Sequence, residues 1–140
     1  MSKIKCSYIG DLKCEAKHLQ SGNLITTDAP LDHCGKGENF SPTDLLATSL
    51  GSCLLTIMSI KARSNGWELN KIYLEIEKIM TKNEERKIEQ LIIDIYIPKN
   101  LTNEKIDLIK NASKDCPVTR NLSESLDLKI NWHHQNISQI

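Results

Sequence analysis

The fold is decided by the stretch Ser41-Pro-Thr-Asp-Leu-Leu-Ala-Thr-Ser-Leu-Gly-Ser-Cys53-Leu-Leu-Thr-Ile-Met58. Its first residues carry helix-start signals: Ser41 can cap the helix, Pro42 suits the first helical position, and Asp44 can complete a capping box. Apolar residues then cover most faces of the helix, which favours a buried position. Asn65-Gly66 is a C-terminal stop signal. We therefore predict one long, buried central helix.

The residues before this helix predict a small sheet and a loop. Residues 3–28 alternate weakly between apolar and polar side chains. This pattern is typical of a β-meander, with strands over roughly 4–9, 12–19 and 23–27. The next segment, 28–40, is rich in turn-forming residues and has no periodicity, so we expect a loop there.

After Trp67 the hydrophobic period changes to two, which predicts strands. Residues 72–76 and 88–97 alternate on either side of a polar loop, as in an antiparallel hairpin with one wet face. Thr102 can cap a second helix that ends near Lys114. A turn or short helix is expected over 117–123. The final alternation, 126–132, predicts one more strand, followed from His133 by a polar, frayed tail.

These elements predict an α+β protein with a single domain over residues 1–140. The order is β-meander, long buried helix, β-hairpin, second helix and final strand. One very apolar helix and two half-apolar sheets cannot all be covered within a chain of 140 residues. We therefore expect a homodimer in which the two subunits share the helical layer.

The composition bears on whether the protein binds nucleic acid or a membrane. The chain has 18 Lys and Arg and 18 Asp and Glu residues, so no global field points to nucleic acid or an anionic membrane. The N-terminus lacks the apolar run of a signal peptide, and no stretch approaches the ~20 apolar residues of a membrane span. We predict a cytoplasmic protein with no nucleic-acid or membrane partner.

The five cysteines raise the question of thiol chemistry. Cys53 lies in the central helix beside the small residues Gly51 and Ser52, which leave room for a molecule to approach its sulfur. Cys116 follows the second helix. Cys53 alone is most simply a small core residue, because free cysteine is among the most buried types. Cys116 alone is ambiguous, since a thiol at a helix end before Pro117 could be mobile and partly exposed. Burial would raise the pKa of Cys53, so a nucleophilic role needs a cation or hydrogen-bond donor beside it.

The joint motif resembles the OsmC/Ohr family of thiol-dependent hydroperoxide reductases. It consists of Ser41-Pro-Thr-Asp-Leu45, then Leu50-Gly-Ser-Cys53, then Cys116-Pro-Val118 with Arg120. The resemblance runs roughly from His18 to Trp132 and is closest to the general OsmC-like branch. It implies the OsmC-like fold and an intertwined homodimer with sites at the subunit interface.

The resemblance also implies roles. Cys53 matches the peroxidatic cysteine, which attacks an organic hydroperoxide and becomes a sulfenic acid. Cys116 matches the resolving cysteine, which closes a disulfide with Cys53. A dithiol, in some relatives a protein-bound lipoyl group, then reduces that disulfide. No cofactor and no metal are implied.

One departure concerns the activating cation. Peroxidases of the family place an arginine from the N-terminal hairpin beside the reactive thiol, held by an acid at the start of the long helix. This chain has no arginine before Arg63. Asp44 stands in or next to the position of the acid. Substitute donors are Arg120 or, from the hairpin, Lys13, Lys17 and His18.

For the remaining cysteines, the simplest interpretation is that they have no functional role. Cys34, in His33-Cys34-Gly35, could be an alternative resolving thiol or a metal ligand, but an exposed loop cysteine without a role is the simpler reading. Cys6 and Cys14 fall in the first strands. No C-x₂-C or H-x₃-H pair is present, so we expect no metal site.

Two other functions stay open at this stage. A non-catalytic binding protein would hold a small hydrophobic ligand at the dimer interface, and the missing N-terminal arginine favours it. A thiol pKa of Cys53 well above the free-cysteine value of ~8.5 would support it. A purely structural role as a dimer partner has no motif in its favour.

Overall fold

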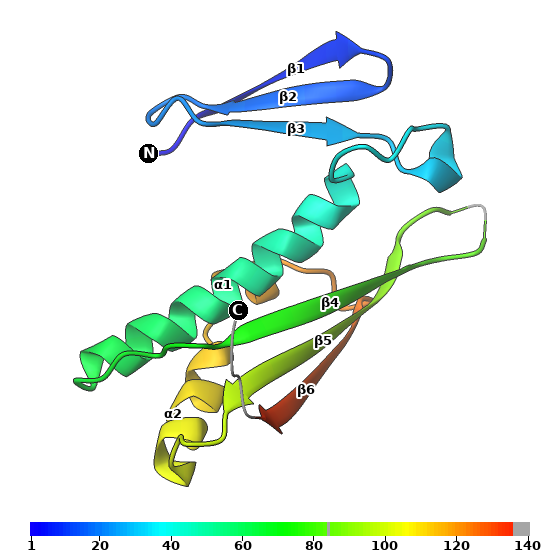
Figure 1. Ribbon diagram of the computed structural model, residues 1–140. Helices are drawn as coiled ribbons and strands as arrows, with labels where there is room; N and C mark the ends of the chain where they lie inside the picture. Colours follow the sequence, from blue (N-terminus) through cyan, green and yellow to red (C-terminus); the bar gives the residue numbers. More distant parts are fainter. Residues whose placement is uncertain (84, 136–140) are drawn as a thin grey trace. The chain divides into compact units, whose positions relative to one another are not determined.

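The computed structural model describes residues 1–83 and 85–135 (Figure 1). The chain clusters into two compact units, Met1–Leu46 and Ala47–Ile140, called here the N-terminal and C-terminal units. Each unit is described by itself. The α+β class predicted from the sequence is confirmed, with one three-stranded sheet in each unit and a long helix that begins at the end of the first.

The N-terminal unit contains the predicted meander. Its strands are β1 (Ile4–Gly10), β2 (Lys13–His18) and β3 (Leu24–Asp28), paired antiparallel in the order β1-β2-β3. Asp28 donates its backbone N–H to Phe40, which ties the following loop back to β3. Within that loop lies a single turn of 3₁₀ helix, η1 (Leu31–His33).

This small sheet has apolar side chains on its exposed surface. The register pairs Tyr8 with Cys14 and Cys14 with Thr27, so these residues share one face with other even-numbered residues of β1 and β2. Ile4, Tyr8 and Ile25 are 63%, 67% and 51% exposed. An apolar sheet face of this kind in a single chain is a candidate for burial against a partner.

The central helix α1 (Pro42–Ser64) begins with the predicted capping box. The Asp44 carboxylate accepts hydrogen bonds from the Ser41 N–H and hydroxyl at 2.8 and 2.7 Å, and the Ser41 hydroxyl oxygen accepts the Asp44 N–H at 3.1 Å. These bonds satisfy donors that a helix N-terminus leaves free. At the other end, Gly66 has a φ of 80°, the left-handed conformation that terminates helices.

In the single chain, only one face of α1 is buried. The buried residues follow helical spacing: Ala47, Leu50, Gly51, Leu54, Met58 and Ala62. Ile60, on another face, is 59% exposed. The long central helix is therefore partly buried within the chain, and its other apolar face is left uncovered, in line with the expectation that one subunit cannot cover so apolar a helix.

By length and composition alone, α1 is the one helix of the described residues that could cross a membrane. Its best window has a mean hydropathy of 1.5, so the expectation that no stretch approaches a membrane span was too strict. The core helix of a soluble protein passes the same test. Of that window 33% is buried inside the structure, and Leu50, Leu54 and Met58 are its fully buried large side chains.

The second sheet belongs to the C-terminal unit. Strands β4 (Tyr73–Met80) and β5 (Ile88–Pro98) form the predicted antiparallel hairpin. Strand β6 (Asp127–Gln135) pairs parallel to β5, a pairing that the sequence analysis did not foresee. A parallel pair needs a long crossover. Here the crossover contains α2 (Asn103–Ser113), capped by Thr102 as predicted, and the short α3 (Pro117–Arg120).

Strand β6 continues three residues beyond the predicted boundary at Trp132. His133 bonds the Asp94 carboxylate at 2.6 Å, and its ring stacks on Tyr96. The prediction of a frayed tail from His133 is therefore wrong as far as Gln135. The rest of that predicted tail, 136–140, lies outside the described residues.

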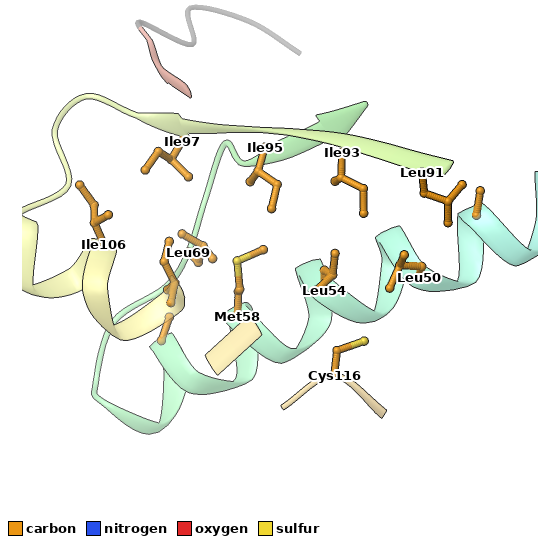
Figure 2. Close-up of a cluster of buried hydrophobic side chains, with 13 residues drawn as sticks. Leu50, Leu54, Met58, Leu69, Leu91, Ile93, Ile95, Ile97, Ile106 and Cys116 are labelled. Atoms are coloured by element: carbon orange, nitrogen blue, oxygen red, sulfur yellow. The ribbon is translucent and has the colours of Figure 1, made fainter. Parts of the chain in front are cut away.

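The core of the C-terminal unit lies between α1 and one face of this sheet. Figure 2 shows Leu91, Ile93, Ile95 and Ile97 of β5 pointing toward α1, where Leu50, Leu54 and Met58 meet them. All seven of these side chains are at most 1% exposed. A Cβ on Gly51 would lie 2.8 Å from Ile76 Cδ1 and 2.9 Å from Leu74 Cδ1, so glycine lets α1 approach β4 closely.

Candidate functional site

The structure brings together the two cysteines that the sequence analysis singled out. The Cys53 and Cys116 sulfurs lie 2.7 Å apart. Cys53 comes from the middle of α1, and Cys116 from the junction between α2 and α3. In Figure 2, Cys116 approaches α1 near Leu54 from the side away from β5. Both are free thiols at a separation from which a disulfide can form with little movement.

The two thiols differ in exposure. Cys116 is completely buried, whereas Cys53 is partly exposed at the edge of the core. A small molecule arriving from solvent therefore meets the Cys53 sulfur first. The other three cysteines, Cys6, Cys14 and Cys34, all belong to the N-terminal unit and are exposed.

The surroundings of Cys53 disfavour a thiolate on its own sulfur. Burial raises the pKa of Cys53, and the contact with Cys116 raises it further. The backbone N–H of Val118 acts in the opposite direction but does not outweigh them. Burial acts in this way because the charged form loses its hydration.

Cys116 has the opposite balance. Burial raises its pKa, but the contact with the Cys53 sulfur and the nearby Thr119 hydroxyl and N–H groups of Thr119 and Val118 together outweigh burial and lower it. Cys116 occupies the N-cap position of α3, although its sulfur makes no capping hydrogen bond of ordinary geometry. The lowering therefore depends on several donors acting together, with the Thr119 hydroxyl foremost after Cys53.

Of the predicted activating cations, Arg120 lies closest in sequence to Cys116. Its guanidinium donates to the Asp115 carboxylate at 2.8 Å, and its side chain is 64% exposed. Within the described part of the C-terminal unit, no lysine or arginine contributes to the pKa of either thiol. The catalytic roles assigned to Cys53, Cys116, Asp44 and Arg120 stay predictions.

Two of the substitute donors of the N-terminal unit, Lys13 and His18, have partners of their own. Lys13 forms an ion pair with Glu38, and this hydrogen bond raises the pKa of Lys13. His18 lies 2.7 Å from the Ser21 hydroxyl and 3.2 Å from the Ser2 hydroxyl. Asp44 is engaged in the capping box. The role predicted for Lys13, Lys17 or His18 stays a prediction.

An open groove of about 480 Å³ lies between α1 and α2. It is lined by four apolar and four polar or charged residues: Ile57, Ile60, Leu108 and Ala112, with Lys61, Ser64, Asn111 and Asp115. Neither cysteine lines it. Across the described residues, 1–83 and 85–135, no three of the metal-ligating types His, Cys, Asp and Glu gather at one point.

Sequence reasoning missed Thr119 and Val118 as parts of this site. The signal was present in Cys116-Pro-Val-Thr119. Proline at the first position of a helix makes the preceding residue the N-cap, and the next two residues then supply free N–H donors. Read in this way, the motif places donors around Cys116.

Comparison with known proteins is consistent with this arrangement. The profile of the family described as OsmC-like protein matches residues 35–131. No curated protein matches the chain. The crystal structure of a protein from Psychrobacter arcticus 273-4, provisionally named for osmotic stress and detoxification response, is 41% identical with a TM-score of 0.87. That match covers 95% of this chain and 96% of the other.

More distant structures share the fold. An OsmC-like protein from Mycoplasma pneumoniae is 20% identical with a TM-score of 0.79, over 96% of each chain. An organic hydroperoxide resistance protein from Legionella pneumophila is 17% identical with a TM-score of 0.74, over 95% of this chain and 96% of that one. At this identity, the likeness shows the architecture alone.

Proposed function

The chain belongs to the OsmC-like protein family, and from this premise we propose that it is a thiol-dependent peroxidase that reduces organic hydroperoxides. Hydrogen peroxide is a further, smaller substrate of the same chemistry. The observation that carries the proposal is the pair of free sulfurs 2.7 Å apart, one reachable and one buried. We call Cys53 and Cys116 the thiol pair.

The proposed cycle consumes one hydroperoxide and two thiols. The Cys53 sulfur attacks the outer peroxide oxygen, the O–O bond breaks, and an alcohol leaves after taking a proton. Cys53 is then a sulfenic acid. The Cys116 sulfur attacks it, forming the disulfide and releasing water. An external dithiol, such as a lipoyl group, returns the pair to its reduced form by thiol–disulfide exchange.

The proposed assembly is a cytoplasmic homodimer. Its support is that apolar side chains are exposed in both units. Ile60 of α1 is 59% exposed, and Ile4 and Tyr8 of the N-terminal sheet are more than half exposed. Exposed apolar patches mark interaction sites in soluble proteins.

Peroxide turnover in single-cysteine variants tests the peroxidase function. With cumene hydroperoxide as oxidant and dihydrolipoamide as reductant, Cys53→Ser should abolish turnover. Cys116→Ser should allow a single oxidation and then stop, because no second thiol closes the disulfide. Cys14→Ser, an exposed cysteine of the N-terminal unit, is the matched control and should retain full activity. Wild-type turnover by Cys53→Ser would exclude the proposal.

A second candidate is a non-catalytic protein that holds a small hydrophobic ligand. The observation in its favour is the pKa of Cys53, which burial raises. This candidate predicts no peroxide-dependent disulfide between Cys53 and Cys116 at any pH. Mass spectrometry of the peroxide-treated protein separates the two functions, because only the peroxidase loses two hydrogen masses from the thiol pair.

A further inference from the structure

We propose that the ion pair between Asp115 and Arg120 is a clamp that positions Cys116 for disulfide closure with Cys53. Arg120 is then a positioning residue, which acts through Cys116, and not the cation that activates the peroxide-reactive thiol. The inference rests on the proposed peroxidase function, because it concerns the step in which Cys116 resolves the oxidised Cys53. It also gives Arg120 a different role from the one expected from the sequence.

The first support is that Arg120 is bonded both to Cys116 and to the residue before it. The backbone N–H of Arg120 donates to the Cys116 carbonyl oxygen at 3.3 Å. The Arg120 guanidinium donates to the Asp115 carboxylate at 2.8 Å. The two bonds from one residue therefore close a ring that contains Cys116, and this ring reaches from the end of α2 to the end of α3.

The second support is the way in which this ring is attached to α2. The Asp115 N–H donates to the Ala112 carbonyl oxygen at 3.0 Å, and the Cys116 N–H donates to the Ser113 carbonyl oxygen at 3.3 Å. Asp115 is therefore bonded to the last turn of α2, and its carboxylate holds Arg120 near that turn. Through Asp115 the ion pair joins the end of α3 to α2, and Cys116 lies at the junction.

The third support is the geometry that disulfide closure needs. The Cys53 and Cys116 sulfurs lie 2.7 Å apart, and a disulfide bond is about 2.05 Å long. Cys116 is completely buried, so the packing of its own segment sets the position of its sulfur. A rotation of α3 about the junction would move that sulfur, and a misplacement of ~1 Å at reacting atoms slows a reaction steeply. The ion pair opposes this rotation.

The exposure of the ion pair sets the size of the expected effect. The side chains of Arg120 and Asp115 are 64% and 71% exposed. Exposed ion pairs contribute little to stability, and salt screens them. We therefore expect loss of the clamp to slow disulfide closure by about threefold, and to leave the fold intact.

The step that the clamp assists is the attack of the Cys116 sulfur on the Cys53 sulfenic acid. The S–S bond forms, the S–O bond of the sulfenic acid breaks, and the hydroxyl group leaves as water with the proton of Cys116. The earlier attack of Cys53 on the hydroperoxide breaks no bond of Cys116. The clamp should therefore change the second step and not the first.

Trapping of the sulfenic acid with dimedone measures the two steps separately. The background is the variant in which Cys6, Cys14 and Cys34 are serine, and cumene hydroperoxide is the oxidant. Asp115→Asn and Arg120→Gln should each slow the decay of the sulfenic acid by about threefold and leave its formation unchanged. The double variant Asp115→Arg with Arg120→Asp reverses the ion pair and should restore the wild-type rate of decay.

Arg63→Gln is the matched control. Arg63 forms an exposed ion pair with Glu68 at the same spacing of five residues, at the end of α1. This variant should leave both rates unchanged. Slower formation of the sulfenic acid in Arg120→Gln, together with faster formation in Asp115→Asn, would make Arg120 the activating cation and overturn the inference. A reversed pair that closes no faster than the single variants would overturn it as well.

Closure with diamide separates this inference from the peroxidase function. Diamide adds to one thiol of the pair, and the second thiol then displaces it as the hydrazine and forms the disulfide. In wild type at about 1 M salt, where the Debye length is ~3 Å, this second step should slow to the rate of Asp115→Asn. Salt-independent closure in wild type would contradict the clamp. If hydroperoxide does not oxidise Cys53, the peroxidase function fails, while diamide still tests the clamp.

Discussion

The cysteines of the two units have very different surroundings. Cys53 and Cys116 of the C-terminal unit are placed by the packing of α1, α2 and α3, with their sulfurs in contact. Cys6, Cys14 and Cys34 of the N-terminal unit lie on strands and a loop, exposed to solvent. The same side chain therefore forms a pair in sulfur–sulfur contact in one unit and a set of exposed thiols in the other. Packing, not residue type, makes this difference.

The largest expected effect is on thiol access. Under native conditions iodoacetamide should modify Cys6, Cys14 and Cys34 first and Cys53 later. Cys116 should react on the order of 100-fold more slowly than the exposed three, because its modification needs local opening that costs about 3 kcal/mol. Timed alkylation with peptide mass spectrometry measures each rate. Equal rates for all five would remove the contrast between the units.

The next effect concerns the core that positions the thiol pair. Leu54, the residue that follows Cys53 in the sequence, is 1% exposed in the core. Leu54→Ala should therefore reduce the free energy of unfolding by about 2–5 kcal/mol. Cys14→Ser, on the exposed sheet of the N-terminal unit, should change it by less than about 0.5 kcal/mol. Urea unfolding of both variants checks this. A small loss in Leu54→Ala would mean that the core does not position Cys53 as described.

The N-terminal caps of α1 and α2 should differ in how much they stabilise the protein. Ser41 is buried and exchanges three hydrogen bonds of 2.7–3.1 Å with Asp44, whereas the Thr102 hydroxyl accepts the Lys105 N–H at 3.4 Å. Ser41→Ala should destabilise by about 1–2 kcal/mol and Thr102→Ala by about 0.5 kcal/mol. Thermal unfolding at matched protein concentration measures both. The opposite ranking would contradict the geometry.

The smallest effect is a pH dependence. Hydrogen bonds from His133 and Asn131 lower the pKa of Asp94 below its usual 3.8. Its stabilising contribution is therefore present above that value and is lost as pH falls through the native pKa. Lys36 lowers the pKa of Asp11 in the same sense, but that pair is more exposed.

The difference between the unfolding midpoints at pH 7 and pH 3 should therefore be smaller in Asp94→Asn than in Asp11→Asn. The cross-strand bonds of Asp94 lie between β5 and β6, whereas Asp11 lies at a turn between β1 and β2. An equal pH response in the two variants would show that the sheet of the C-terminal unit adds nothing to this interaction.

Local patterns predicted most of the elements. The capping box at Ser41, the stop at Gly66 and the alternation of Leu91 to Ile97 all depend on residues close in sequence, and each is present as expected. The family followed from the joint cysteine motif, and the profile match confirms it.

Contacts between distant segments could not be predicted from residue patterns, and the Cys53–Cys116 contact was expected only from the family resemblance. The parallel pairing of β6 with β5 depends on the crossover that packs α2, which periodicity alone does not reveal. The donors around Cys116 were missed because the motif was read for its cysteine rather than for its helix cap. The burial of the other faces of α1 depends on contacts outside the single chain, and the residue pattern of α1 does not identify those contacts.

The parallel register of β5 and β6 has a consequence for how the protein matures. It joins residues 37 positions apart, such as Asp94 and Asn131. Non-local pairing of this kind forms slowly, because the chain loses the entropy of loop closure before the contacts between the strands stabilise it. Cys116 lies within that loop, between α2 and α3, so the crossover that links the two parallel strands also carries the second sulfur of the pair to α1.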